Sequence, residues 1–334
     1  MKLPEPWIEK SRQFVKAVKE LAQKLVSLPK RINRKEITIP GLFKKLRERL
    51  KAIQLRQVVF IISLLVFCYS SFMIVSILVD GYRNKKVYSA ISEIYHREAE
   101  ESQAESATKP EAGAEELQGE LQSPVPEKAE SKDYYEVLQE IEAKRHENMI
   151  QGKFYPLLEI NEDVVGWIHI PNTRIDYPVV QGTDNDYYMD HDIHGEESRG
   201  GAIFMDFRNN VKPLDENTIL YGHHMKNGTM FKDLVKFKKQ DFFEENRFVY
   251  FDTLYENNTW EIFSVYVTDT NFYYIIPSFR SKEDYKEFLK TIQEKSMYET
   301  DIELSPDDEI LTLSTCDYTF EDARLVVHAR RVKG

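Results

Sequence analysis

The sequence predicts a mostly β domain with an inserted helix, preceded by a single membrane-spanning helix. Three observations lead to this prediction. A run of 22 residues without a formal charge, Val58–Val79, lies in the first quarter of the 334-residue chain. An acidic segment of low complexity follows it. From Tyr155 onward, short apolar or alternating runs are separated by turn residues, which is the pattern of regularly spaced strands.

Charge is divided unevenly along the chain. Residues 1–57 contain 16 Lys/Arg against 5 Asp/Glu, a net charge of +11. The whole chain has a net charge of −11, so the remaining residues carry −22. We interpret residues 1–57 as a basic cytoplasmic segment. Its apolar residues at helical spacing, from Phe14 to Leu25, fit either an amphipathic helix on an anionic leaflet or a solvated tail that only sets topology.

Residues 58–79 are predicted to form a transmembrane helix. About 20 apolar residues span the ~30 Å hydrocarbon core of a bilayer, whereas the apolar part of a cleavable signal peptide has only ~7–15 residues and ends in small residues. This run ends instead in Asp80-Gly81-Tyr82-Arg83. The excess of Lys/Arg before it predicts a single-pass protein of the cell membrane, with a cytoplasmic N-terminus and an extracellular remainder.

Residues 80–133 are predicted to be an acidic flexible linker. After a short continuation of the helix over residues 85–97, the segment 98–132 is rich in Glu, Ala, Ser, Gln and Pro and has no aromatic residue. Such a composition buries too little apolar surface to fold. Residues 134–154 then predict a helix that leads into the folded domain, whose limits we place at 134–334.

The folded domain should be an antiparallel barrel or sandwich with one inserted helix. Pro, Gly, Asn and Asp separate its β-forming runs, and the domain is long enough to bury a core. Ser281–Tyr298 breaks this pattern, because its apolar residues from Tyr285 to Ile292 share one helical face and Ser281 with Asp284 resembles a capping box. The expected strands are 164–170, 177–181, 202–205, 218–221, 248–251, 259–268, 309–315 and 324–330.

The two cysteines of the chain differ in context. Cys68 lies in the apolar run, whereas Cys316 ends the predicted strand 309–315 and is a candidate reactive thiol, since an exposed extracellular thiol tends to oxidise. Arg324 opens the next strand after seven intervening residues. If these strands pair antiparallel, Cys316 and Arg324 face each other with Cβ atoms ~5 Å apart. A guanidinium there favours a thiolate and can donate hydrogen bonds to an oxyanion.

A histidine is the expected proton carrier beside this thiol. His223 and His224 follow the predicted strand 218–221 and Gly222, a tight exit from which a side chain can project into a cleft. An imidazole there would take the thiol proton and return it to a leaving amine. Simpler interpretations stay open, with Cys316 as a packing residue and Arg324 and the two histidines as surface residues.

We expect no metal ion or other cofactor. Two cysteines cannot build a zinc framework, and no carboxylate pair at ligand spacing lies near His223 and His224. The acidic residues of the segment 184–192 are interpreted as a solvated loop rather than a calcium site.

The stretch from about Tyr155 to Lys333 resembles the sortases, cysteine transpeptidases that join proteins to the cell wall of Gram-positive bacteria. Three motifs carry the resemblance, namely Tyr221-Gly222-His223, Leu313-Ser314-Thr315-Cys316 and Asp322-Ala323-Arg324. The class B subgroup is the most similar. The segments that look like class B are 165–171, 175–181, 200–206 and 222–231, together with the helix at 281–298.

The resemblance implies an eight-stranded barrel in which His223, Cys316 and Arg324 are catalytic. Cys316 would attack the carbonyl after the threonine of a C-terminal sorting signal and form a thioacyl enzyme. His223 would protonate the departing amine, and Arg324 would bind the oxyanion. The implied partners are surface proteins bearing a sorting signal, the membrane lipid and an amine of the peptidoglycan cross-bridge, and we expect no nucleic acid.

Two alternatives to cell-wall anchoring stay open. A pilus-forming class B member would use a pilin lysine as the amine, and a non-enzymatic membrane-tethered binding module could keep the same barrel. Around the nucleophile, several residues are candidates for contacting the peptide. They are Ser314, Thr315 and Tyr318, which flank Cys316, and Tyr273 and Tyr274, for which ordinary aromatic packing is the alternative.

Overall fold

The computed structural model of the chain describes residues 55–108 and 149–333. Residues 1–54, which hold most of the basic segment, lie outside the described residues. So do residues 109–148, which hold the rest of the expected linker and most of the expected helix 134–154. Contacts divide the chain into two compact units, residues 1–72 and 73–334, and the second unit contains the folded domain.

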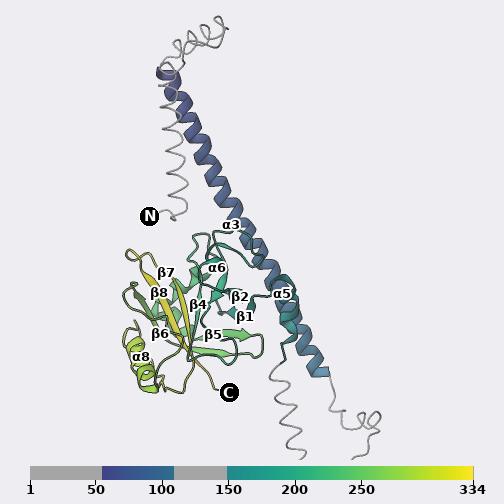
Figure 1. Ribbon diagram of the computed structural model, residues 1–334, viewed down its shortest axis with the longest axis vertical. Helices are drawn as coiled ribbons and strands as arrows, with labels where there is room; N and C mark the ends of the chain where they lie inside the picture. The colour runs from purple at the N-terminus through teal and green to yellow at the C-terminus, as the bar shows by residue number, and fades with distance from the viewer. Residues whose placement is uncertain (1–54, 109–148, 334) are drawn as a thin grey trace, which may run out of the picture. The chain divides into compact units, whose positions relative to one another are not determined.

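The folded domain is built on a closed eight-stranded barrel (Figure 1). Around the barrel the strands follow the order β1-β2-β3-β4-β7-β8-β6-β5. The predicted fold class is confirmed, and each predicted strand is present with ends that differ by no more than two residues. The strands are β1 (Val164–His169), β2 (Asp176–Val180), β3 (Ile203–Met205), β4 (Asn217–Tyr221), β5 (Phe248–Thr253), β6 (Thr259–Thr268), β7 (Ile310–Cys316) and β8 (Arg324–Arg331).

Two strand pairs are parallel, which differs from the antiparallel arrangement expected. β2 with β3 and β4 with β7 run parallel, while the other neighbours run antiparallel. Parallel neighbours need a long crossover between them. Residues 181–202 connect β2 to β3, and residues 222–309, which include β5 and β6, connect β4 to β7. The second crossover brings the end of β7 beside the end of β4.

The predicted inserted helix is confirmed as α8 (Lys282–Glu294). At its N-terminus the Ser281 hydroxyl accepts the backbone N–H of Asp284 at 3.1 Å, as an N-cap does. Its apolar face, including Tyr285 and Ile292, packs with Val326 of β8 in a second small core. The remaining short helices are η2 (Gly152–Phe154), α5 (Tyr155–Ile160), α6 (Tyr187–Asp190), η3 (Phe231–Lys238) and α7 (Gln240–Glu245).

Helix α3 (Leu55–Thr108) contains the apolar run and continues far beyond it. It includes one stretch that is long and apolar enough to cross a membrane. Beyond that stretch, Tyr88, Ile91 and Tyr95 are buried in the main core of the barrel domain. The Tyr95 ring stacks on Trp167 of β1, with centroids 4.1 Å apart.

The structure therefore differs from the expected linker over residues 80–108, which are helical and in part packed on the barrel. Tyr88, Ile91 and Tyr95 recur at the three- and four-residue spacing that places side chains on one helical face. The average composition of residues 80–133 obscures this local pattern. In the described part of the expected helix 134–154, only the short turn η2 is helical.

Candidate active site

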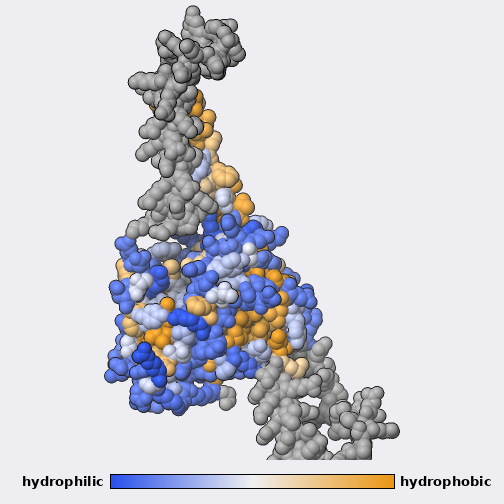
Figure 2. Space-filling view, viewed as in Figure 1, coloured by the Kyte–Doolittle hydropathy of each residue, from blue (hydrophilic) through white to orange (hydrophobic). Residues whose placement is uncertain are grey.

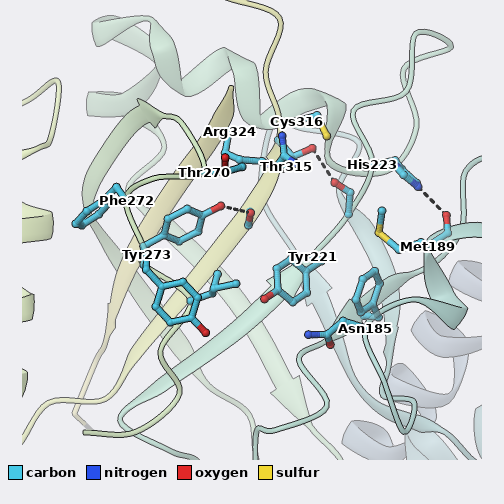
Figure 3. A pocket seen from close by; sticks show the side chains of 15 residues that line it. Asn185, Met189, Tyr221, His223, Thr270, Phe272, Tyr273, Thr315, Cys316 and Arg324 are labelled. Atoms are coloured by element: carbon cyan, nitrogen blue, oxygen red, sulfur yellow. Dashed lines mark hydrogen bonds between the residues drawn. The ribbon is translucent and has the colours of Figure 1, made fainter. Parts of the chain in front are cut away.

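A pocket of about 330 Å³ opens at the ends of β4 and β7 and the start of β8. Figure 3 shows its lining, with Cys316, His223 and Arg324 along one edge. The three candidate catalytic residues, which are separated by up to 101 positions in the sequence, thus border the same cavity. The parallel pairing of β4 with β7 accounts for this, because Tyr221 pairs with Ser314 and both strands end in the same direction.

Cys316 is the last residue of β7 and is half-buried. The antiparallel pairing of β7 with β8 places it directly opposite Arg324, as the spacing predicted. One guanidinium nitrogen of Arg324 donates to the carbonyl oxygens of Asp322 at 3.3 Å and Ala323 at 3.2 Å. In Figure 3 the thiol lies between the side chains of Arg324 and His223. A guanidinium and an imidazole therefore flank the thiol.

His223 reaches the pocket because the chain makes a close exit from β4 at Gly222. A Cβ atom on Gly222 would lie 2.5 Å from the Ile203 side chain and 2.8 Å from Phe231, so no larger residue fits without displacement. The Nε2 atom of His223 is 2.7 Å from the carbonyl oxygen of Met189. A carbonyl oxygen only accepts hydrogen bonds, so this contact assigns a proton to Nε2.

His224 is not among the residues that line this pocket and bonds instead to the backbone of Cys316. It is buried, its Nδ1 donates to the carbonyl oxygen of Cys316 at 2.9 Å, and its Nε2 accepts from Lys232 at 2.7 Å. Burial lowers the pKa of His224, and the neighbouring Lys232 ammonium lowers it further, against the opposing effect of the Cys316 hydrogen bond. The neutral ring thus holds the backbone of Cys316 in place.

Ser314, Thr315 and Tyr274 line the pocket, as expected for peptide-contacting candidates. The Thr315 hydroxyl donates to the carbonyl oxygen of Gly222 at 2.7 Å, which ties β7 to the exit from β4. The Ser314 hydroxyl and the Tyr274 hydroxyl are 2.8 Å apart. Burial raises the pKa of Tyr274, although Ser314 and the charge of Arg324 act in the opposite direction. Each of these three hydroxyl groups thus has a hydrogen-bond partner within the protein.

The two remaining tyrosine candidates lie differently. Tyr273 lines the pocket and is exposed, and its hydroxyl accepts from Arg208 at 2.9 Å. Tyr318 is 66% exposed and is not among the lining residues of this pocket. Its hydroxyl donates to the carbonyl oxygen of His224 at 3.2 Å, and its ring lies against the His224 imidazole. Tyr318 therefore borders the layer behind Cys316 rather than the cavity.

Sequence reasoning missed about half of the lining. The additional residues come from α6 and the loop before it, from β3, from β4 and the residue after it, and from the loop before α8. They are Asn185, Met189, Phe204, Tyr221, Gly222, Thr270, Phe272 and Ile275. In the sequence, Tyr221 and Gly222 could have been identified as lining residues because they directly precede His223. Asn185 and Met189 belong to the segment interpreted as a solvated loop. That interpretation fails at Asp192, which is buried and accepts the backbone N–H groups of His194 at 3.0 Å and Glu196 at 3.2 Å.

A buried carboxylate supports the floor of the pocket. Asp206 accepts from Tyr221 at 2.8 Å, from Asn185 at 3.0 Å and from two nitrogens of Arg208 at 2.7 and 2.8 Å. Burial alone would raise the pKa of Asp206, but the hydrogen bonds and charge of Arg208 outweigh burial and lower it. Asp206 thus stays ionised and fixes two lining residues, Tyr221 and Asn185.

Comparison with known proteins identifies the family. A model of the sortase domain matches residues 168–332. Sortase B of Listeria monocytogenes is 40% identical over 185 residues, which cover 55% of this chain and 75% of that protein. The chain belongs to the sortase family. Sortase B of Staphylococcus aureus is 38% identical over 217 residues, covering 64% of this chain and 89% of that protein.

The fold of this sortase agrees with the class B relatives. The crystal structure of sortase B from B. anthracis in complex with AAEK1 is 40% identical and has a TM-score of 0.58. The match covers 77% of this chain and 100% of that one. The predicted resemblance to class B sortases is confirmed. Sortases are cysteine transpeptidases, a chemistry for which a thiol, an imidazole and a guanidinium on one pocket are suitable groups.

Proposed function

We propose that this sortase is anchored in the cell membrane and joins proteins to the cell wall. It cleaves a C-terminal sorting signal after a threonine and transfers the new carboxyl end to an amine of the peptidoglycan cross-bridge. The observation that carries the proposal is the meeting of Cys316, His223 and Arg324 on one pocket, at the ends of three neighbouring strands. Helix α3 supplies the anchor, with the N-terminus in the cytoplasm and the barrel outside.

In the first step the Cys316 thiolate attacks the backbone carbonyl carbon of the threonine in the signal. A C–S bond forms and the carbonyl oxygen takes the negative charge, to which Arg324 donates hydrogen bonds. When this intermediate collapses, the C–N bond breaks and His223 gives a proton to the leaving amine. Because the Met189 carbonyl keeps a proton on Nε2 of His223, the transferred proton is carried on Nδ1 in this arrangement.

In the second step a neutral amine attacks the thioacyl carbon. His223 takes the proton that the amine loses, an amide C–N bond forms, and Cys316 leaves as a thiolate. Tyr274, Ser314 and Thr315 form the wall along which the peptide lies, with Tyr273 at its exposed rim. The enzyme returns to its starting state without a cofactor.

The test is cleavage and transfer by the full chain in detergent. A peptide library with threonine followed by varied residues is incubated with either a peptidoglycan cross-bridge peptide or a lysine-containing pilin peptide. Mass spectrometry then identifies both products. We expect cleavage after threonine, with the cross-bridge amine joined to the new carboxyl end. Transfer to the lysine peptide alone would favour pilus assembly.

A methanethiosulfonate reagent separates an enzyme from a binding module. Cys316 in an active site should react rapidly with the reagent, whereas a packing cysteine should not. The reaction is followed on the Cys68→Ser variant, so that the thiol in the apolar run is absent. A slow reaction at Cys316 together with no cleavage of any peptide would contradict the enzymatic proposal.

A further inference from the structure

The junction between the apolar run and the barrel has no spacer. The Asp80 carboxylate, one residue beyond Val79, accepts the backbone N–H of Arg199 at 3.3 Å. A Cβ atom on Gly81 would lie 3.0 Å from the side chain of Asn227. Two loops of the barrel domain, residues 196–201 and 226–228, therefore touch α3 in the first turn after its uncharged stretch. We call them the junction loops.

The first junction loop is shaped to lie against this turn of the helix. Arg83 donates to the carbonyl oxygen of Glu197 at 2.8 Å and pairs with the Glu196 carboxylate at 3.0 Å. Asn84 is buried and donates to the Ser198 hydroxyl at 3.1 Å. A Cβ atom on Gly200 would lie 2.8 Å from the Asn84 amide, so the backbone approaches the helix closely here.

The next turn of the helix also contacts this loop. The Tyr88 hydroxyl donates to the carbonyl oxygen of Gly201 at 3.0 Å, and Tyr88 itself is buried in the main core. Gly201 has a φ of +55°, a conformation that favours glycine. Contacts on two successive turns fix the loop relative to the helix, so the loop cannot move away from the end of the apolar run.

The rise of an α-helix per residue gives the distance between these contacts and the end of the apolar run. A helix rises 1.5 Å per residue, so Asp80–Asn84 extend only about 8 Å beyond Val79. The headgroup region adds roughly 5–8 Å on each side of the hydrocarbon core. Tyr82 is 72% exposed in this same turn, at the level where amphipathic aromatic rings are common in membrane proteins. The junction loops thus lie at the depth of the headgroups.

We infer that the junction loops dock on the phospholipid headgroup layer, so that the barrel sits directly on the membrane surface. This inference rests on the proposed membrane anchoring. One junction loop follows α6, which carries Met189, and the other follows His223 closely in the chain. Both junction loops are therefore close in the chain to residues that line the pocket, Met189 and His223.

The docking does not depend on electrostatic attraction between the junction loops and the headgroups. The junction carries cations, such as Arg83 and Lys226, and anions, such as Glu196 and Glu197, without a dominant sign. The continuous helix holds the loops against the headgroups through geometry alone. We therefore expect the same depth in neutral phosphatidylcholine vesicles and in vesicles that contain phosphatidylglycerol.

Spin labels measure this depth in the full chain reconstituted in vesicles. In a Cys68→Ser, Cys316→Ala background, one label is attached at Glu197→Cys or Lys226→Cys in the junction loops. The matched controls are Glu287→Cys and Lys286→Cys on α8, which are exposed and lie away from α3 (Figure 1). We expect collisions with an aqueous nickel complex to be at least threefold less frequent for the junction labels than for their controls.

An insertion variant tests whether the short junction causes the protection. Twelve Gly/Ser residues placed between Val79 and Asp80 leave the contacts of Asp80–Tyr88 intact but release the barrel from the bilayer. The nickel accessibility of the junction labels should then rise to that of the controls. Equal accessibility of junction and control labels without the insertion would overturn the docking inference.

Alkaline extraction of the vesicles keeps the two proposals apart. If the protein stays in the vesicles and the junction labels are as accessible as the controls, anchoring holds and docking is wrong. If extraction removes the protein, the proposed anchoring is wrong, and the docking inference falls with it.

Discussion

Two groups of side chains at the pocket differ in their hydrogen bonds. We call Cys316, His223 and Arg324 the mouth, and His224, Ser314 and Thr315 the layer behind it. At the mouth, Cys316 and Arg324 are half-buried, and the hydrogen bonds of the Arg324 side chain go to the carbonyls of its two preceding neighbours. Behind the mouth, His224, Ser314 and Thr315 are buried and each bonds to a neighbouring strand or loop. The hydrogen bonds of this layer hold the backbone of β7, whereas the side chains of Cys316 and Arg324 make no hydrogen bond to a neighbouring strand among the described residues.

The surface around the pocket also differs from the wall of the pocket in polarity. The face in Figure 2 is mostly hydrophilic, with separate apolar areas on the barrel domain. Large apolar side chains close to the pocket include Met189, Phe207 and Tyr273, which are all exposed. A peptide entering the mouth would thus meet apolar side chains at the rim and bonded polar groups on the wall.

The largest expected effect is that of Cys316→Ala. It should abolish cleavage of the sorting-signal peptide, because no other group in the mouth can form the thioacyl bond. The melting temperature should stay within about 2 °C, since the substitution removes only one half-buried sulfur. Peptide cleavage and thermal unfolding are measured on the same preparation. Residual cleavage would show that Cys316 is not the nucleophile.

The other two residues of the mouth should lower the rate without unfolding the protein. His223→Ala and Arg324→Ala should each reduce kcat/KM by about 10²–10⁴-fold, the usual contribution of a positioned acid or of an oxyanion donor. Arg324→Lys is the matched control, because it keeps the charge but loses the planar fork of donors. Recovery of most of the activity in this variant would mean that charge alone is sufficient.

Substitution of His224, in the layer behind the mouth, should lower the stability of the protein and reduce its activity less than substitutions in the mouth do. His224→Ala leaves the carbonyl of Cys316 and the ammonium of Lys232 without a buried partner, so the free energy of unfolding should fall by about 1–3 kcal/mol. The loss in kcat/KM should be smaller than that of His223→Ala. Urea unfolding and peptide cleavage test this pair of expectations.

His224→Asn provides a control, since its amide can still donate to the Cys316 carbonyl. Part of the lost stability should return in this variant. If His224→Ala is inactive while its unfolding curve matches that of the unsubstituted chain, the proton carrier is His224 and the division between mouth and layer is wrong.

Much of this division could be predicted from the sequence where local patterns determine it. The strands follow from short runs of β-forming residues, and seven residues between Cys316 and Arg324 were enough to predict their register. By contrast, nothing local predicts that β4 pairs in parallel with β7, because that pairing depends on a crossover of 88 residues, 222–309.

The same limit applies to side chains that act outside periodic elements. Asn185 and Met189 line the pocket from a polar segment, a loop and the short helix α6, that has no repeating pattern. The different environments of His223 and His224 are set by neighbours distant in the sequence, Met189 for one and Cys316 for the other. Their adjacency alone left both histidines as candidates. The motif similarity, rather than spacing, favoured His223.

The remaining expected effect concerns a histidine still deeper in the barrel. His328 of β8 is fully buried between the Tyr266 hydroxyl at 2.8 Å and the Thr312 hydroxyl at 2.8 Å. Burial lowers the pKa of His328 to about 3. In the unfolded chain the same ring takes up a proton near pH 6.5. The unfolded state therefore binds more protons between pH 6.5 and 3, and the stability contributed by the neutral ring is lost as pH falls through this window.

The His328→Gln variant lacks this titration and isolates it. From pH 7 to pH 5 the free energy of unfolding of the unsubstituted chain should fall by about 2 kcal/mol more than that of the variant, at about 1.4 kcal/mol per pH unit below 6.5. Carboxylates such as Asp206 titrate in both proteins and cancel in the difference. Urea unfolding at pH 7, 6 and 5 gives the two slopes. Equal slopes would mean that His328 takes up a proton in the folded barrel as readily as in the unfolded chain.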